Sequence, residues 1–458
     1  MTRTQRIALV CLLLSCGVSV SLGFFLERAA PDFMMDFRSV YYGARCLLQH
    51  TDPYQEGAFL RTYLAEEGDR TILSAGFRQV LMRDLYLPTA SVLIVPLAML
   101  PWGPAHLLWM ILTAVSLVVA GFLIWNLGAT SAPVLSGILI CLVLANSEVL
   151  FATGNAAGIA VSLCVVAVWC FFKERFVPAG ILCLAVSLAL KPHDAGLVWL
   201  YFLVVGGTYR NRALQTLFIT AVLGLSAALW VSHVAPHWVR ELHSNLLVDA
   251  APGGTGNPGP TSSTGRTVSM VIDLQAAVSA FRDDPRIYNP VSYLVCGALL
   301  LVWSVRTLRL RFSQTIAWLA LAAIAPLTLL VIYHRPSDAK LLLLAVPACA
   351  MLWAEGGEIG RLAVVVTTAG IVSTADLPLI AFLALTKNLR ISAVGQSGQI
   401  LTDLLLRPAP LVLLPMAVFY LWVYVRRAIP GPGRGSKSLT TQPDEQPATA
   451  SPGLMPMQ

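Results

Sequence analysis

Asp36 is the residue in this sequence best placed to act as a base. It lies shortly after the first apolar run, next to Phe37. Helical spacing puts Asp36, Val40 and Gly43 on one face of a short helix that should lie along a membrane surface. A carboxylate partly desolvated by aromatic and methionine neighbours can take a proton from a hydroxyl group. The alternative is that Asp36 caps a helix or forms a solvated ion pair with a nearby arginine.

Cationic side chains at the ends of two apolar helices form a second group of candidates. Lys191 and His193 end a short apolar helix, and His334, Arg335 and Lys340 begin another. Ionisable residues at the edge of a membrane are costly, so a functional role is the default hypothesis for them. Cations at such a boundary suit a lipid phosphate. The alternative for the two lysines is that their side chains simply extend to the membrane interface.

Other motifs are weaker. Gly154 and Asn155 come directly before an apolar helix, where backbone N–H groups can face a phosphate, although a plain helix-breaking turn explains the pair equally well. His193 and His334 are too far apart in sequence to indicate a metal without a third ligand, so we expect no metal site. The sequence has no P-loop, no GxSxG and no HExxH motif, and we expect no nucleotide and no cofactor.

The composition identifies the elements that must position these residues. Hydrophobic residues make up 57% of the 458 residues and charged residues 12%, and the mean hydropathy is +0.72. Repeated apolar runs of roughly 15 to 22 residues are each able to cross a membrane, and the first of them is interpreted as an uncleaved span. The net charge of +7 comes from basic residues gathered in short turns, which indicates topology and not nucleic-acid binding. The sequence predicts an all-α polytopic membrane protein.

The basic turns also predict an orientation. If the short, proline-containing run at 86–101 re-enters the membrane without crossing it, every basic turn falls on the cytoplasmic side. We therefore predict about twelve spans, with both termini in the cytoplasm. Asp36, Asn155, Lys191 and the segment at 333–338 then share the extracytoplasmic face.

The predicted domain organisation is simple. One membrane domain is expected at 1–429, followed by a disordered cytoplasmic tail at 430–458. Large extracytoplasmic loops are expected at 27–85 and at 234–288. Within the second loop, the turn-rich stretch 250–265 is either a lid over a site or slack chain.

The order of these motifs resembles the GT-C class of membrane glycosyltransferases, and most closely glycosyltransferase family 87, the bacterial alpha-mannosyltransferase-like proteins. The motifs that carry the resemblance are Asp36-Phe37, Tyr41-Tyr42, Asp52-Pro53-Tyr54, Tyr86-Leu87-Pro88, Gly154-Asn155, Leu190-Lys191-Pro192 and the segment 333–338. The sequence departs from relatives at Asn155, where glutamine is more frequent. That departure leaves the class intact and the identity of the sugar and acceptor open.

The resemblance implies a sugar transfer with inversion on the extracytoplasmic side of the bacterial inner membrane. The donor would be a polyprenyl-phosphate hexose, with mannose the first candidate, and the acceptor a hydroxyl of a glycolipid or glycan. Asp36 matches the first-loop aspartate that looks like the general base of the family. The other implied contacts are Lys191, His334, Arg335 and Lys340 for the donor phosphate, and Asn155, His193 and Tyr54 for the substrate. No nucleic acid, metal or cofactor is implied, and the membrane lipid is the remaining partner.

Two other classes of function fit parts of the pattern. A lipid or glycolipid transporter or flippase would also carry short, interrupted helices, but the sequence shows no corresponding halves. An O-antigen polymerase or ligase would place key arginines in a large late loop, and the loop at 386–408 offers only Lys387, Arg390 and Arg407.

Overall fold

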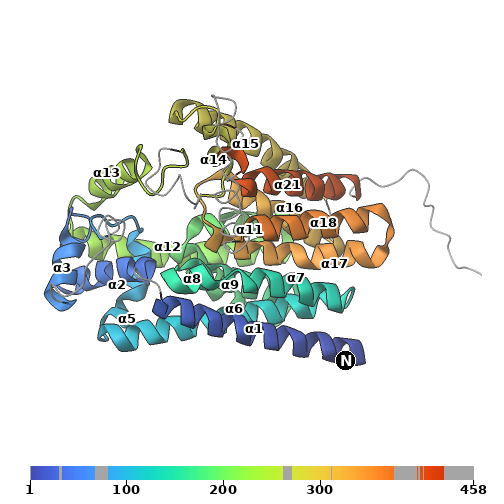
Figure 1. The fold of residues 1–458 in the computed structure, drawn as a ribbon, viewed down its shortest axis with the longest axis horizontal. Helices are drawn as coiled ribbons and strands as arrows, with labels where there is room; N and C mark the ends of the chain where they lie inside the picture. The colour runs from blue at the N-terminus through green and yellow to red at the C-terminus, as the bar shows by residue number, and fades with distance from the viewer. Residues whose placement is uncertain are drawn as a thin grey trace, which may run out of the picture. The chain divides into compact units, whose positions relative to one another are not determined.

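Every regular element that the computed structural model describes is a helix (Figure 1). The structure describes residues 2–29, 34–67, 81–260, 271–310, 312–375, 400, 403–405 and 407–427. This confirms the predicted all-α class. The predicted tail at 430–458, the end of the 250–265 stretch, and Lys387 and Arg390 lie outside this part of the chain.

Long apolar helices make up most of the fold. Eight segments of the described chain are long and apolar enough to cross a membrane, when α7 is counted with α8 and η1 with α17. These segments are α1 (Arg3–Ala29), α6 (Trp102–Gly128), α7 (Pro133–Ala145) with α8 (Glu148–Thr153), α12 (Gly207–Val234), α15 (Pro285–Arg309), α16 (Gln314–Val331), η1 (Pro336–Ala345) with α17 (Val346–Glu355), and α21 (Pro408–Arg427). The chain is therefore a multi-pass membrane protein.

Shorter helices complete the fold. Among them are α9 (Ala157–Phe172), α10 (Val177–Leu190), α11 (Pro192–Val205) and α18 (Gly357–Ser373). Prolines occupy the first turn of several helices, where a missing N–H breaks no helical hydrogen bond. These helices are α5 (Pro88–Ala98), α7, α10, α11, α15, η1 and α17. Prolines thus set where these helices begin.

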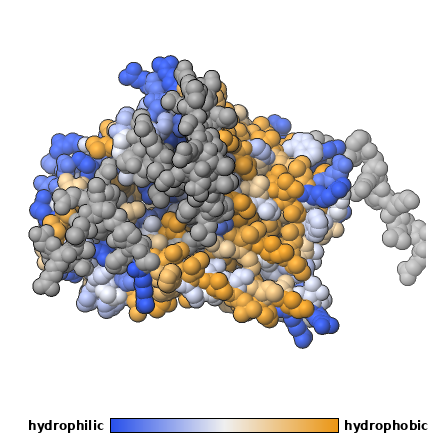
Figure 2. Space-filling view, viewed as in Figure 1, coloured by the Kyte–Doolittle hydropathy of each residue, from blue (hydrophilic) through white to orange (hydrophobic). Residues whose placement is uncertain are grey.

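The surface has the distribution expected of a membrane protein. Large apolar side chains such as Leu14, Phe218 and Leu294 are more than half exposed, on α1, α12 and α15. Figure 2 shows hydrophobic residues along the flank of the helices and hydrophilic residues gathered towards the two ends. Contact of these apolar side chains with lipid is favourable, whereas their exposure to water would be unfavourable.

One end of the helices carries basic turns. Arg212 pairs with Glu174, and Arg427 pairs with Glu355, while Arg306 donates to the carbonyl of Val425 over 2.8 Å. Figure 1 places the start of α1, the turn between α17 and α18, and the end of α21 at the same end of the molecule. We call the turns at Glu174 and Glu355, each paired with an arginine (Arg212 and Arg427), the basic turns.

Short elements gather at the opposite end. They are α2 (Met35–Leu48), α3 (Ala58–Glu67), α5 (Pro88–Ala98) and α13 (Trp238–Ala250). The eleven residues of α5 span roughly 16 Å, about half of a ~30 Å hydrocarbon layer, so α5 is too short to cross it alone. Its end is tied to α2, because Tyr41 donates its hydroxyl to the carbonyl of Leu100 over 2.8 Å.

The first part of the 250–265 stretch is anchored. Arg407, which is 3% exposed, donates to the carbonyl oxygens of Pro258 and Ala276 over 2.8 and 3.0 Å. Ala276 belongs to the short helix α14 (Leu274–Ser279), so the arginine joins this loop to α14.

Candidate active site

The start of α2 is fixed against the end of α8. Met34, which caps α2 in a left-handed conformation, donates its backbone N–H to the carbonyl of Ala152 over 2.6 Å. The side chain of Phe37 stacks on Trp109 of α6 with ring centroids 4.6 Å apart. These contacts hold the first turn of α2, and with it Asp36, beside the end of α8.

Gly154 makes this approach possible. It ends α8 with φ +66°, and a Cβ at this position would lie 2.8 Å from both the Met34 sulfur and the Phe37 Cβ. Any other residue would force α2 away from α8 and would also be strained at this φ. Trp109 donates its indole N–H to the Gly154 carbonyl over 2.9 Å. The residue that follows is thereby aimed at α2.

Asn155 joins Asp36 to the rest of the site. Its side-chain amide donates to Asp36 Oδ2 over 2.6 Å, and its Oδ1 accepts from Lys191 Nζ over 3.4 Å and from the Ala157 backbone N–H over 2.9 Å. The amide is therefore fully oriented. Asp36 is half-buried, and its other oxygen stays available to an incoming hydroxyl.

Nearby arginines are engaged elsewhere. Arg38 lies over the Trp102 ring at 4.5 Å and donates to the Tyr63 hydroxyl over 3.1 Å. Arg45 pairs with Glu66. Neither Arg38 nor Arg45 forms an ion pair with Asp36 among the residues that the structure describes, whereas Arg335 interacts with it electrostatically.

Lys191 is the centre of the cluster. It occupies the break between α10 and α11, and its Nζ contacts Asp338 Oδ1 at hydrogen-bond distance and Asp194 Oδ2 at 3.7 Å, besides Asn155. An ammonium group has three N–H donors, and here they face three protein acceptors. Lys191 thus holds the cluster together, and it is only 9% exposed.

Two histidines lie on the far side of Asp194. His334 Nε2 is 3.4 Å and His193 Nε2 is 3.8 Å from Asp194 Oδ1, and the two imidazole rings are 4.9 Å apart. His334 is fully buried, and its Nδ1 is 2.6 Å from the carbonyl oxygen of Ile332. Burial lowers the pKa of His334, but the carboxylates of Asp194 and Asp338 outweigh this effect and raise it. We call Asp36, Asn155, Lys191, His193, Asp194, His334 and Asp338 the site cluster.

Arg335 is the cation with unused donors. Its backbone N–H donates to Asp338 Oδ2 over 2.7 Å, and its Nε donates to the Tyr333 hydroxyl. No acceptor for its two terminal nitrogens is found among the residues that the structure describes. The side chain is half-buried, so a planar fork of N–H groups remains for an anion.

Two of the predicted residues lie apart from the site cluster. Lys340 is 2% exposed, and its Nζ donates to the carbonyl of Asn146, near the end of α7. Tyr54 donates its hydroxyl to the carbonyl of Tyr86 over 3.0 Å, and its backbone carbonyl accepts from Asn245 of α13 over 3.0 Å. In this conformation, both side chains serve packing between elements.

Asp84 carries a buried carboxyl group near Tyr54, and none of the described residues places a cation beside it. Asp84 accepts the N–H of Tyr86 over 2.9 Å through Oδ1, while Oδ2 has no hydrogen-bond partner in the described chain. Burial raises the pKa of Asp84 to about 8. A neutral carboxyl group here needs no counter-ion, in contrast to Asp338.

Sequence reasoning assigned no role to Asp194 and Asp338, although both are central. Asp194 follows Lys191 by one helical turn, and Asp338 follows His334 by about one turn. This spacing was the available signal, because an acid one turn from a base on a helix faces the same side. Their mutual approach depends on the packing of α11 against η1 and could not be inferred.

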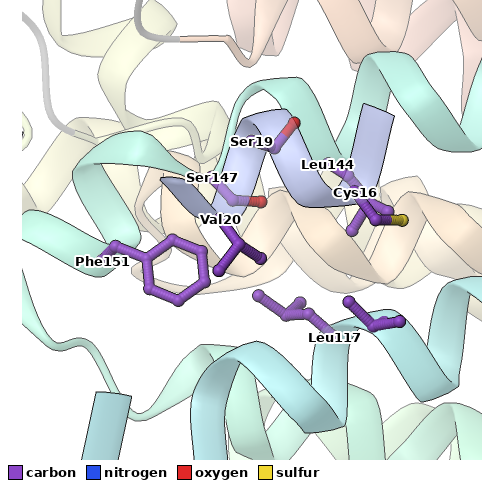
Figure 3. A pocket seen from close by; sticks show the side chains of 8 residues that line it. Cys16, Ser19, Val20, Leu117, Leu144, Ser147 and Phe151 are labelled. Carbon is purple, nitrogen blue, oxygen red and sulfur yellow. The ribbon is translucent and has the colours of Figure 1, made fainter. Parts of the chain in front are cut away.

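A small cavity lies away from the site cluster. Figure 3 shows Cys16, Ser19 and Val20 of α1 facing Leu117 of α6 and Phe151 of α8 around it. Its volume of about 10 Å³ suits one water molecule, and its lining is almost entirely apolar. It offers no chemistry of its own.

The fold and site together define a multi-pass α-helical membrane protein whose charged side chains meet where helices are interrupted. The sequence model of glycosyltransferase family 87 matches residues 85–332, more than half of the chain. The chain belongs to glycosyltransferase family 87 and is a glycosyltransferase. Asn155 and Lys191 lie inside the matched segment, whereas Asp36 and His334 lie outside it. No curated protein and no solved structure matches the chain.

Proposed function

We propose that this glycosyltransferase is a GT-C enzyme that moves a hexose, with mannose the first candidate, from a polyprenyl phosphate to a glycolipid or glycan hydroxyl. The observation that carries the proposal is the 2.6 Å hydrogen bond from Asn155 to Asp36 Oδ2. This bond fixes one carboxylate oxygen and leaves the other for the acceptor. Donor and acceptor are both membrane-bound, which suits a site at the end of membrane helices.

The reaction needs one base and one direct displacement. Asp36 takes the proton of the acceptor hydroxyl as its oxygen attacks the anomeric carbon of the donor sugar. The bond from that carbon to the phosphate oxygen breaks, and the polyprenyl phosphate leaves. One displacement of this kind inverts the anomeric configuration.

The leaving group explains the need for cations. A sugar phosphodiester has one negative charge, and the phosphomonoester that departs gains a second, so positive charge near the phosphate stabilises the transition state more than the ground state. Arg335 has the free donors for this contact. Lys191, His334 and His193 lie behind it in the site cluster and contribute positive charge or orientation. A direct contact of Lys340 or Tyr54 with substrate would require them to leave the bonds they make here.

The membrane face follows from the two ends of the molecule. The turn between α17 and α18 and the end of α21, which the Glu355–Arg427 pair joins, lie at the end opposite the short elements that carry Asp36. Turns with basic residues are retained in the cytoplasm. We therefore assign the site cluster to the extracytoplasmic face of a bacterial inner membrane.

The test is transfer by the purified protein in lipid, with a polyprenyl-phosphate mannose or a nucleotide mannose as donor and a crude lipid extract as acceptor. We expect transfer from the lipid-linked donor alone, and a loss of at least about 100-fold in Asp36→Asn, because general-base catalysis contributes roughly that much. Glu355→Gln at the basic turns is the matched control. A wild-type rate of transfer by Asp36→Asn would contradict the assignment of Asp36 as the base. Transfer from the nucleotide sugar would contradict the lipid-linked donor.

Arg335 provides a second arm of the same assay. Arg335→Gln should lower kcat/KM for the lipid-linked donor by about tenfold or more, with most of the loss in kcat, since hydrogen bonds to a charged group contribute about 1.5–3 kcal/mol and this contact strengthens in the transition state. The KM for the acceptor should stay within about twofold of wild type. If the substitution changed only the KM for the acceptor, Arg335 would be assigned to the acceptor site instead of the donor phosphate.

A further inference from the structure

The most unusual group outside the proposed proton transfer is the carboxylate of Asp194. Its side chain is fully buried, and neither of its oxygens has a hydrogen-bond partner in the part of the chain that the structure describes. A buried carboxylate without hydrogen bonds is unfavourable by several kcal/mol, and such a group calls for an ion, a water or a proton that satisfies it.

The surroundings of Asp194 are divided between its two oxygens. Oδ2 faces Lys191 Nζ at 3.7 Å, whereas Oδ1 faces His334 Nε2 at 3.4 Å and His193 Nε2 at 3.8 Å. The ligand-capable atoms of the three side chains all lie within 4.8 Å of one another. Two imidazoles and one carboxylate thus converge on one point.

The hydrogen bond on the far side of His334 fixes which nitrogen is available. Its Nδ1 lies 2.6 Å from the Ile332 carbonyl oxygen, which can only accept, so Nδ1 carries a proton. In the neutral imidazole, Nε2 then presents a lone pair to Asp194 Oδ1. A metal-ligating histidine is oriented in this way by a backbone carbonyl.

The net charge around Asp194 also favours a bound cation. Three carboxylates, Asp36, Asp194 and Asp338, face two permanent cations, Lys191 and Arg335, so the region is one negative charge in excess when both histidines are neutral. A site that receives a phosphodiester anion should not repel it.

We propose that His193, Asp194 and His334 bind one divalent transition-metal ion, of the zinc class. Two imidazole nitrogens and one carboxylate oxygen form a common three-ligand set that leaves a position open. Neighbouring ligand atoms around tetrahedral zinc are about 3.3 Å apart, close to the 3.4 Å between His334 and Asp194. His193, with 31% of its side chain exposed, needs only a small rotation to complete the set.

A bound divalent ion reverses the net charge of the region. The excess of one negative charge becomes one positive charge, and His193, with 31% of its side chain exposed, is the least buried of the three ligands. The ion would there add to Arg335 in binding the donor phosphate. This role rests on the proposed function, whereas ion binding itself does not.

The test measures metal directly in the full-length protein in lipid nanodiscs. The protein is stripped with a chelator, reloaded with zinc or cobalt, and analysed for metal content and for the cobalt absorption spectrum. We expect about one equivalent of zinc and a tetrahedral cobalt spectrum from nitrogen and oxygen ligands. His193→Ala and His193→Gln should weaken binding at least tenfold, and His243→Ala, an exposed histidine on α13, should not.

The outcomes separate the two proposals. Equal metal content in the wild type and in both His193 variants would overturn the metal site. Absence of metal binding by the wild type would also overturn it, and a protonated His334 would then be the group that satisfies Asp194. Metal bound with loss in the His193 variants supports the site whatever the transfer assay shows. Normal binding together with full transfer by Asp36→Asn would instead reject the proposed base alone.

Discussion

Ion pairs at the two ends of this molecule are built from the same residue types but in different surroundings. At the basic turns, Arg427 and Glu355 are 30% and 44% exposed, and each pair holds a turn in place at the surface. In the site cluster, Lys191 and Asp338 are 10% and 2% exposed and contact three further groups, which are Asn155, Asp194 and the backbone N–H of Arg335. Exposed pairs contribute little to stability, whereas breaking a buried pair leaves an uncompensated charge. From this comparison we propose that the buried charges are retained for function.

Removing the cation at the centre of the site cluster should have the largest effect. Lys191→Met leaves Asp338 and Asp194 buried without their cation, and we expect a loss of about 3–5 kcal/mol in unfolding free energy together with loss of transfer. Thermal unfolding in detergent and the transfer assay measure these two effects. A variant as stable as wild type would mean that the cluster is better solvated than its burial indicates.

The close approach of α2 and α8 should be next in sensitivity. Gly154→Ala adds a Cβ that lies 2.8 Å from the side chains of Met34 and Phe37, at a φ of +66°. We expect a destabilisation of about 2–3 kcal/mol from overpacking and backbone strain, and a slower transfer because Asn155 moves relative to Asp36. Gly196→Ala in α11 is the control, since a Cβ there meets no atom within 4 Å.

The buried carboxyl group of Asp84 should respond to pH. Because burial raises its pKa to about 8, the folded state keeps a proton between about pH 4 and pH 8 that the unfolded state releases. Stability should therefore fall as pH rises through this window. Asp84→Asn removes this dependence and should raise the free energy of unfolding relative to wild type at pH 9, by about 1 kcal/mol or more, with little difference at pH 4. An equal difference at both values would contradict a protonated Asp84.

The smallest effect is expected at the basic turns. Arg427→Met removes the partner of Glu355, and since both are exposed we expect a change within about 0.5 kcal/mol and normal transfer. Thermal unfolding of Arg427→Met and of Lys191→Met under the same conditions measures the difference between the two ion pairs. A loss comparable to that of Lys191→Met would remove the distinction between the two ends.

Much of the fold could be predicted from the sequence because the membrane imposes it. Apolar runs such as 105–126 and 213–233 became α6 and α12, since helices are the structures that satisfy backbone groups in lipid. The helices α5, α7 and α11 begin at Pro88, Pro133 and Pro192, where a proline is compatible with the first helical turn. The ten-residue 3₁₀ helix η1 was not foreseen, because the sequence from Pro336 has the composition of an ordinary span.

The site was predictable in its parts but not in its connections. Asp36, Asn155 and Lys191 were each selected from sequence, and the structure joins them through two hydrogen bonds. The burial of His334 and of Lys340 was not predictable, because it depends on which neighbours pack around η1. Residue type indicated a phosphate contact for both, and only three-dimensional packing shows that their donors face the protein.

Labelling from each side of the membrane tests most directly that the two ends lie on opposite faces, with the Asp36 end outside. A cysteine is introduced by His243→Cys on α13 or by Glu358→Cys at the start of α18, both exposed, with wild type as background for the native thiols. A membrane-impermeant maleimide should label His243→Cys in intact cells, and Glu358→Cys only after permeabilisation. Labelling of Glu358→Cys in intact cells, or of His243→Cys only after permeabilisation, would contradict the account.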